Sequence, residues 1–289
     1  MNQIKTNSES EHWDIVIRPH GSLFNLQLTD VWRYRDLLLL FVKRDFSAQY
    51  KQTILGPLWH IIQPIFTTAI FLLLFGKIAN IPTDGIPPVL FYMSGIAIWN
   101  YFSACLSNTS TTFVTNSGIF GKVYFPRLVL PLSVVVSNII RLGIQFVLLL
   151  GAMVWFHFKG FPIHITTLWL WLPLLVLLIA GIGLGLGIII SSLTTKYRDF
   201  TVLMTFLVQL LMYVSPIGYP LSYLGHSKYK AIINLNPLSS IIETFRYVLF
   251  QKGNWDLSWL LYSFSFMVIS LLIGLLIFSR VEKTFMDSV

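Results

Sequence analysis

A short polar face interrupts one of the most apolar runs of the chain. Arg141 follows Asn138 by three residues and precedes Gln145 by four, so the three side chains share one face of a helix. A charge within an apolar helix is costly and needs a partner. Two roles are open. In the structural one, Arg141 bonds to neighbouring helix ends or pairs with Glu243; in the binding one, it lines a path and meets a lipid phosphate.

The sequence contains no recognisable motif of catalysis. The segment 118–122 contains a Gly-Lys pair but neither the spacing nor the following Ser or Thr of an ATP-binding loop. The six histidines lack metal-ligand spacing, and the Ser-rich stretches lack the His and Asp that would activate a nucleophile. The apolar runs contain no Asp or Glu, which argues against a proton- or sodium-coupled carrier. The sequence predicts a transport subunit with no enzymatic activity, metal or cofactor of its own.

Four glycines alternate with apolar residues at positions 181, 183, 185 and 187. They look superficially like a dinucleotide-binding fingerprint, but they lie inside an apolar run and do not follow a strand. Small residues at this spacing allow helices to approach closely in a membrane. We therefore expect helix packing, not nucleotide binding.

The composition is that of an integral membrane protein, with 55% hydrophobic and only 11% charged residues and a mean hydropathy of +0.71. Apolar runs occupy 58–78, 89–106, 128–156, 168–193, 201–215 and 258–278. A crossing helix needs about 20 residues, so the fifth run must continue past Pro216 or lie buried. The second can continue through the polar stretch 107–115 only beside a cavity or protein. The predicted fold is all-α, with six transmembrane helices.

Basic residues predict the orientation of these helices. The N-terminal arm, the loops near 122–127 and 196–198 and the C-terminal tail hold thirteen Lys and Arg residues, whereas the short opposite loops hold two. The positive side is normally cytoplasmic, so both termini are predicted to lie there. The net charge of +8 then reflects topology and not nucleic-acid binding. The predicted regions are a cytoplasmic arm (1–28), an amphipathic helix with its lead-in (29–57), the transmembrane domain (58–280) and a tail (281–289).

Residues 29–50 have the pattern of a helix lying in the membrane interface. Thr29 or Asp30 can cap its start. One helical stripe is apolar, whereas the basic residues fall on another face. The apolar stripe is Leu38, Leu39, Val42, Phe46 and Tyr50, and the basic residues are Arg33, Arg44 and Lys51. The helix is either a passive anchor or a surface for membrane lipid headgroups or a partner.

Two segments outside the runs carry more chemistry than a simple connection requires. The loop 116–127 combines glycines, two cations and the aromatic residues Phe120, Tyr124 and Phe125. These aromatic side chains need cover from headgroups or another protein.

On the opposite side, Asn236 and Pro237 can cap a helix, with Ser240 and Glu243 as an alternative start and Gly253 as a stop. About 14 residues reach only ~21 Å, so this helix and 216–224 are predicted to form a re-entrant or interfacial pair.

Several blocks resemble one known family, and they occur in its order from about residue 35 to 246. The blocks are RDL at 35–37, KRDFSAQYKQTILGPLWHIIQP at 43–64, GKVYFPRLVLPL at 121–132, KYRD at 196–199, Ser215-Pro216, and LNPL at 235–238 with Arg246. Together they resemble ABC-2 type permeases that export polysaccharides. The resemblance implies a homodimer in the inner membrane of a bacterium. Two partner ATPases, which bind the ATP and Mg, would drive export of O-antigen, teichoic acid or capsule on a lipid carrier.

The resemblance also implies roles for particular residues. Those implied to couple to the ATPase are Arg44, Tyr50, Lys51, Lys122, Phe125 and Arg127. Segment 216–250 is implied to form an outer gate, with Pro216, Asn236, Pro237, Glu243 and Arg246. Aromatic rings stack on sugars with little dependence on register, so the candidate path residues are Trp99, Tyr101, Phe102 and Tyr213, with Arg141. Packing or a lipid-facing belt is the alternative for each ring.

Three other functions remain open from the sequence. An ABC-2 exporter of a drug or small lipid would use the same interface helix. A membrane glycan acyltransferase would need an intramembrane His or acid, for which only His60 is a candidate. A non-transporting scaffold would leave export independent of ATP hydrolysis.

Overall fold

A computed structural model describes residues 28–285 of the chain, except for 52, 121–124, 195–196, 198 and 226–227. Every regular element in this part of the chain is helical, which confirms the all-α prediction. Nearly all of the predicted N-terminal arm, and Lys122, lie outside the described residues.

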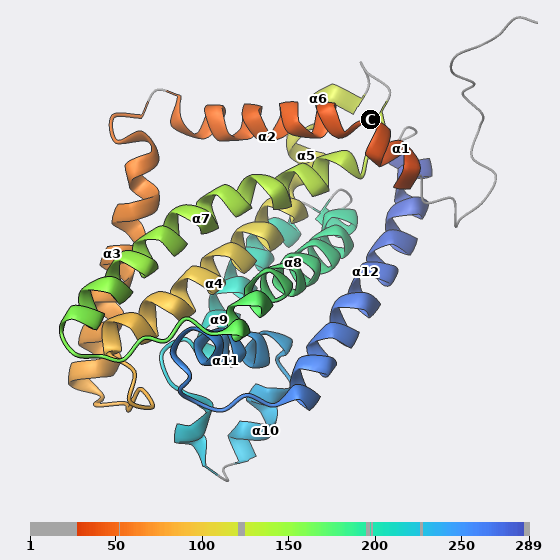
Figure 1. Cartoon of the computed structure of the whole chain (residues 1–289). Coiled ribbons are helices and arrows are strands. Elements are labelled where there is room, and N and C mark those ends of the chain that lie inside the picture. The colour runs from red at the N-terminus through yellow and green to blue at the C-terminus, as the bar shows by residue number, and fades with distance from the viewer. Residues whose placement is uncertain are drawn as a thin grey trace, which may run out of the picture.

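Five helical segments are long and apolar enough to cross a membrane (Figure 1). They are Gly56–Ile78, which contains α3 (Trp59–Phe71) and a π-helical end (Leu72–Ile78); α4 (Pro88–Ser110); α7 (Val129–Phe158); Thr167–Thr194, which contains α8 (Leu172–Thr194); and Leu257–Arg280 within α12 (Leu257–Phe285). The second run does continue into the polar stretch, through α4 and then α5 (Thr112–Thr115). The chain is therefore a membrane protein, although a count of six crossings is not confirmed.

The remaining apolar helix, α9 (Asp199–Val214), has 16 residues, about 24 Å at 1.5 Å per residue. It neither continues past Pro216 nor lies buried, since Met204 is its one buried residue. Its two ends nevertheless lie at opposite ends of α4. The preceding Thr194 donates to the carbonyl of Ser110, and the following segment meets Phe91 through Arg246. The helix thus runs along the height of the bundle.

The four glycines of α8 let two helices approach it from different sides. A methyl group on Gly187 would lie 2.6 Å from Cβ of Thr109 in α4, and one on Gly183 would lie 2.9 Å from Cβ of Cys105. A methyl group on Gly185 would lie 2.8 Å from the backbone nitrogen of Leu271 in α12. Ordinary side chains cannot occupy these positions at such distances, so the predicted packing role is confirmed.

The predicted interface helix is two helices, α1 (Leu28–Arg33) and α2 (Arg35–Tyr50), which break at Tyr34. Thr29 and Asp30 lie within α1 instead of capping one long helix. The expected apolar stripe is also rotated. Phe41 and Val42 are buried, whereas Leu39 is 59% exposed, because α2 packs against α7 across the end of the bundle (Figure 1).

The opposite end of the bundle carries α10 (Lys228–Asn234) and α11 (Pro237–Phe250). Within the segment expected to be re-entrant, the helical part before α10 is only a 3₁₀ turn at Leu221–Leu224. Helix α11 ends at Phe250 because Gln251 adopts a left-handed conformation (φ 53°); Gly253 is not its stop. Eleven of the fourteen residues of α11 are buried, so it packs within the bundle rather than covering it as a surface lid.

Candidate transport sites at the two ends of the bundle

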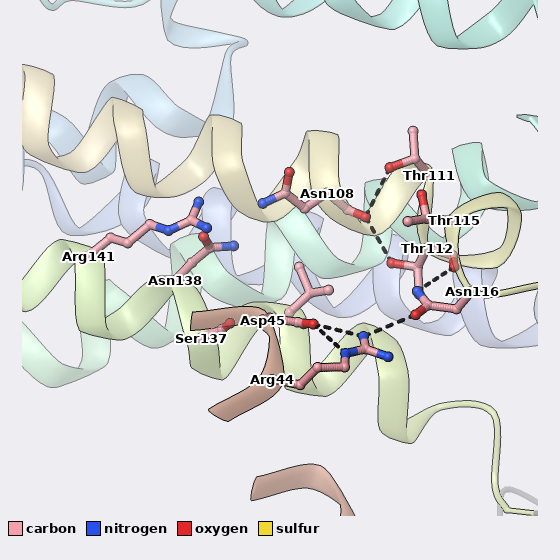
Figure 2. Close-up of a pocket in the computed structure, with 11 residues that line it drawn as sticks. Arg44, Asp45, Asn108, Thr111, Thr112, Thr115, Asn116, Ser137, Asn138 and Arg141 are labelled. Atoms are coloured by element: carbon pink, nitrogen blue, oxygen red, sulfur yellow. Dashed lines mark hydrogen bonds and ion pairs between the residues drawn. The ribbon is translucent and has the colours of Figure 1, made fainter. Parts of the chain in front are cut away.

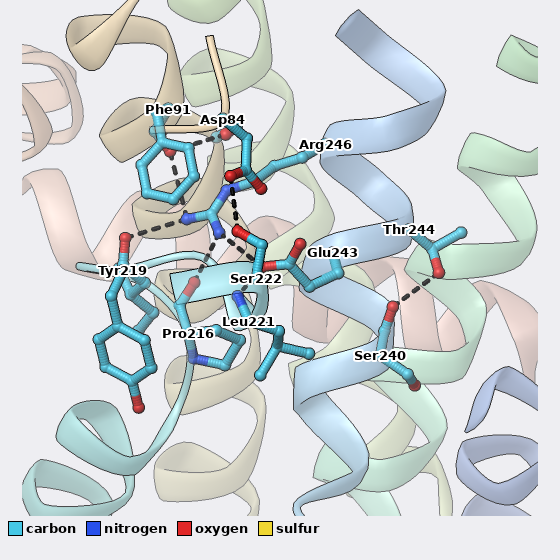
Figure 3. Close-up of polar contacts among 12 residues, drawn as sticks. Asp84, Phe91, Pro216, Tyr219, Leu221, Ser222, Ser240, Glu243, Thr244 and Arg246 are labelled. Atoms are coloured by element: carbon cyan, nitrogen blue, oxygen red, sulfur yellow. Dashed lines mark hydrogen bonds and ion pairs between the residues drawn. The ribbon is translucent and has the colours of Figure 1, made fainter. Parts of the chain in front are cut away.

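Arg246 is the centre of a buried polar cluster at the α11 end of the bundle (Figure 3). Its Nη1 donates to the carbonyl of Pro216 (2.6 Å), and its Nη2 donates to the carbonyls of Ile217 (2.9 Å) and Phe91 (3.4 Å). The guanidinium also stacks on the Phe91 ring, 3.6 Å from its centroid. We call Phe91, Pro216, Ile217, Glu243 and Arg246 the Arg246 cluster. It joins α11 to the start of α4 and to the chain that leaves α9.

Glu243 supplies the negative charge of this cluster. Its Oε1 lies 3.3 Å from Nη1 of Arg246 and accepts from the backbone N–H of Leu221 (3.4 Å). Burial raises the pKa of Glu243, while Arg246 opposes that shift. Burial lowers the pKa of Arg246 to about 10, so its guanidinium is charged at neutral pH. The expected pairing of Glu243 with Arg141 is wrong, because Glu243 pairs within its own helix.

Asn236 performs the capping role predicted for it. Its side chain accepts from the N–H of Leu238 (3.1 Å), and Pro237 occupies the first helical turn. Its Nδ2 also donates to Oγ of Ser215 (2.9 Å), which ties the cap of α11 to the end of α9. The alternative capping box is wrong, because Ser240 lies inside the helix and shares a hydrogen bond with Ser263.

The loop before α4 joins the same end of the bundle. Asp84 accepts a 2.6 Å hydrogen bond from Oγ of Ser222, and Lys252 donates to the carbonyl of Gly85 (2.7 Å). Sequence reasoning missed these contacts, because Asp84 and Ser222 are 138 positions apart and no motif joins them. The five residues predicted for the outer gate therefore gather at one end of the molecule, with loop 79–87 fastened beside them.

At the α2 end, Phe125 lies where the predicted coupling loop meets α7. The Phe125 side chain is buried, and its ring lies 5.6 Å from that of Phe41 in α2. Together with Val129 and Leu130, these two rings form a small apolar cluster of their own. The loop and the interface helix are thus in direct contact.

The other residues implied to contact an ATPase differ in exposure. Lys51 is exposed and Arg127 is half-buried. Arg44 turns into the bundle instead of standing on an outer basic face, and it bonds to Asp45 and to Oδ1 of Asn116 (3.0 Å). The side chain of Tyr50 is outside the described residues, as is Lys122.

The candidate path aromatics are separated by the structure. Trp99, Tyr101 and Phe102 are buried within the main apolar core, at 4%, 2% and 1% exposure. A ring enclosed on all sides has no face for a sugar, so this placement supports packing, the alternative role. Tyr213 is 61% exposed near the end of α9.

Arg141 lines a polar cavity of about 260 Å³ between α2, α7 and the α4–α5 junction (Figure 2). The lining includes Arg44, Asp45, Asn108, Asn116, Asn138 and Arg141, together with three Thr residues, Ser137 and Val134. The polar stretch 107–115 did indicate a cavity or protein contact. The participation of Asp45 and Asn116 had no comparable signal, because it depends on how α2 crosses the bundle.

The described residues contain no group of three His, Cys, Asp or Glu side chains placed to hold a metal ion. What the geometry shows is a buried polar cluster that fastens helices at one end, a cross-helix contact at the other, and a polar cavity beneath that contact.

The model of the family described as ABC-2 type transporter matches residues 36–250. This chain belongs to that family. As an ABC-2 family member, it is a transport subunit and works with a partner ATPase.

Curated relatives of this ABC-2 chain cover most of its length. An O-antigen export system permease protein of Klebsiella pneumoniae is 28% identical over 255 residues, which is 87% of this chain and 94% of the relative. A protein of the same description from Myxococcus xanthus is 26% identical over 230 residues, or 77% of this chain and 83% of the relative.

Proposed function

We propose that this ABC-2 chain is the permease subunit of a system that exports a polysaccharide resembling O-antigen, carried on a lipid, across the bacterial inner membrane. The observation that supports this proposal most strongly is the similarity to O-antigen export permeases over 77–87% of the chain. Teichoic acid and capsular polysaccharide belong to the same substrate class. We propose that the energy comes from ATP, which the partner binds with Mg. The apolar runs have no Asp or Glu of the kind that proton- or sodium-coupled carriers use.

The proposed assembly has two copies of this chain and two ATPase subunits. Both α3 and α9 expose apolar residues, among them Phe66 (66%) and Phe206 (57%), and these helices are our candidates for the seam between copies. Because α9 and the segment after it extend from one end of α4 to the other, we count α9 as the sixth crossing. An even number of crossings and the basic-residue bias together support the proposal that both termini lie in the cytoplasm.

Coupling is proposed to pass through α2 and the loop before α7. Closure of the ATPases would press on α2 and on the loop residues, and the Phe41–Phe125 contact would carry the movement into α7. Lys51 and Arg127 are two described cations beside this route that do not line the cavity. At the other end, the Arg246 cluster would hold the exit closed until α4 and α9 shift.

Replacing Phe125 with Leu tests the coupling route. The substitution keeps most apolar burial but loses a ring–ring contact of about 0.5–1.5 kcal/mol. We expect the export rate per ATP hydrolysed to fall several-fold, with the ATPase still bound, as measured by transport and co-purification. Phe158→Leu, at an 83% exposed position of the opposite end, is the control and should change neither. Equal export per ATP in the two variants would rule out this route.

Depleting the chain in its host tests the substrate class. We expect surface polysaccharide to decrease and lipid-linked polysaccharide to accumulate inside the cell, with both restored by re-expression. Unchanged surface polysaccharide would contradict the proposal. If a small lipid or drug accumulates instead, the chain is the other kind of ABC-2 exporter.

A further inference from the structure

The polar cavity beneath α2 has the size and lining of a headgroup site. Its volume of about 260 Å³ far exceeds the ~10–15 Å³ that a single water needs and lies just below the ~300 Å³ of typical ligand sites. A polysaccharide chain would not fit, but one small polar group would. Val134 is the one apolar residue in its lining, so the occupant is polar.

Asn138 is the strongest indication of an occupant. Its side chain is 1% exposed, and neither its Oδ1 nor its Nδ2 has a hydrogen-bond partner of ordinary geometry. The thiol of Cys105 lies beside it but is a weak partner. A buried amide left unsatisfied costs about 1–3 kcal/mol. Because Asn138 also lines the cavity, a bound group can supply the missing contacts.

The charge of the lining favours an anion. The lining contains two guanidinium groups, those of Arg44 and Arg141, but only one carboxylate, that of Asp45. Asp45 lies 2.7 Å from Arg44, and it also disfavours an anion placed directly beside it. Thr111 and Thr112 donate their hydroxyl protons to carbonyls of α4. The charged donors in the lining are those of the arginines, and Asn138 adds an amide N–H. Arginine and amide N–H groups around a small volume suit phosphate oxygens.

The position of the cavity connects it to the membrane. Its lining extends from α2, which lies across the end of the bundle, to Arg141 within α7 (Figures 1 and 2). Helix α7 has 30 residues, about 45 Å, whereas the hydrocarbon core measures ~30 Å. The first turns of α7 therefore reach headgroup depth. Asn138 and Arg141, nine and twelve residues after Val129, lie about 14–18 Å further along the helix, so a phosphate bound there would extend from the headgroup layer into the bundle.

We propose that the cavity formed by Arg44, Asn138 and Arg141 binds the phosphate headgroup of a membrane lipid. The inference rests on the proposed function in one respect: the lipid that fits a polysaccharide exporter is the phosphorylated carrier, held while its glycan enters the path. Arg141 and Asn138 contact the phosphate, and Arg44, positioned by Asp45 and Asn116, covers it from α2. Pressure on α2 would then act on the headgroup directly.

Binding to the purified full-length chain tests the site. Farnesyl phosphate, farnesyl diphosphate, farnesol, phosphatidylglycerol and inorganic phosphate are titrated separately in neutral detergent and followed by native mass spectrometry. We expect the two farnesyl phosphates to bind and farnesol not to bind. Arg141→Gln and Asn138→Leu should each weaken that binding by about tenfold or more, and Arg141→Lys should recover part of it. Lys159→Gln, which removes one positive charge from an exposed position just after the other end of α7, should leave it within about twofold.

The outcomes distinguish the possible sources of phosphate. Phosphatidylglycerol that displaces farnesyl phosphate at equal concentration would support the headgroup site but assign it to bulk anionic lipid. Inorganic phosphate that binds as tightly as the lipids, or binding unchanged in both cavity variants, would overturn the proposal. If a variant loses binding only because it is unfolded, its melting temperature falls and Arg141→Lys fails to recover binding, which also overturns it. Host depletion measures the proposed function independently, so either can fail alone.

Discussion

Replacing Arg246 with Met is expected to cost about 3–5 kcal/mol of folding free energy, because it leaves Glu243 as a buried charge without its partner. The carbonyls of Pro216, Ile217 and Phe91 lose their donors at the same time. The apparent melting temperature in detergent should fall by roughly 10 °C, and proteolysis of the segment between α9 and α11 should become faster.

A second substitution separates charge from packing in this prediction. Adding Glu243→Gln to Arg246→Met removes the unpaired charge, so the double variant should be more stable than Arg246→Met alone. Arg35→Met, at an exposed position, is the matched control and should leave the melting temperature within a degree or two. An Arg246→Met chain as stable as the control would show that the cluster does not hold this end together.

Replacing Gly185 with Val is expected to be at least as disruptive. The first carbon of the new side chain would lie 2.8 Å from backbone atoms of Ser270 and Leu271, and backbone cannot move aside as a flexible side chain can. Overpacking of this kind costs typically 1–3 kcal/mol and more where backbone must shift. We expect a large loss of folded protein, measured as the monodisperse fraction after solubilisation.

Glycines of α7 provide the control for this effect. Gly143 and Gly151 lie in a helix with no atom of another residue near the position of a Cβ. Their replacement by Ala should be neutral or stabilising by up to about 1 kcal/mol. If Gly185→Val were tolerated as well as these, the close approach of α8 and α12 would not be needed for folding.

Composition and the local pattern of the sequence were sufficient to predict the helices. Apolar runs located the helices, and the Asn236-Pro237 pair located the start of α11. Small-residue spacing alone indicated the packing of α8. These features depend on residues that are close together in the sequence, so a single sequence is enough to predict them.

The errors concern contacts between distant segments. Arg141 and Glu243 are both polar residues in apolar surroundings, so pairing them was reasonable, but α11 satisfies Glu243 with its own Arg246. A path and a core were both open for Trp99 and Phe102, and their burial in α4 supports the core. The rotation of α2 was unpredictable because the partner of its apolar face, Phe125, lies in a loop 84 positions after Phe41.

ATP-dependent movement of lipid-linked polysaccharide into sealed vesicles is the most direct test of the account. The vesicles would contain this chain with its partner ATPase, and protection of the glycan from an added glycosidase would report transfer. The account predicts protected glycan only when ATP, Mg and both proteins are present, and none with a hydrolysis-deficient ATPase. Protection that continues with the deficient ATPase, or active hydrolysis without protected glycan, would contradict it.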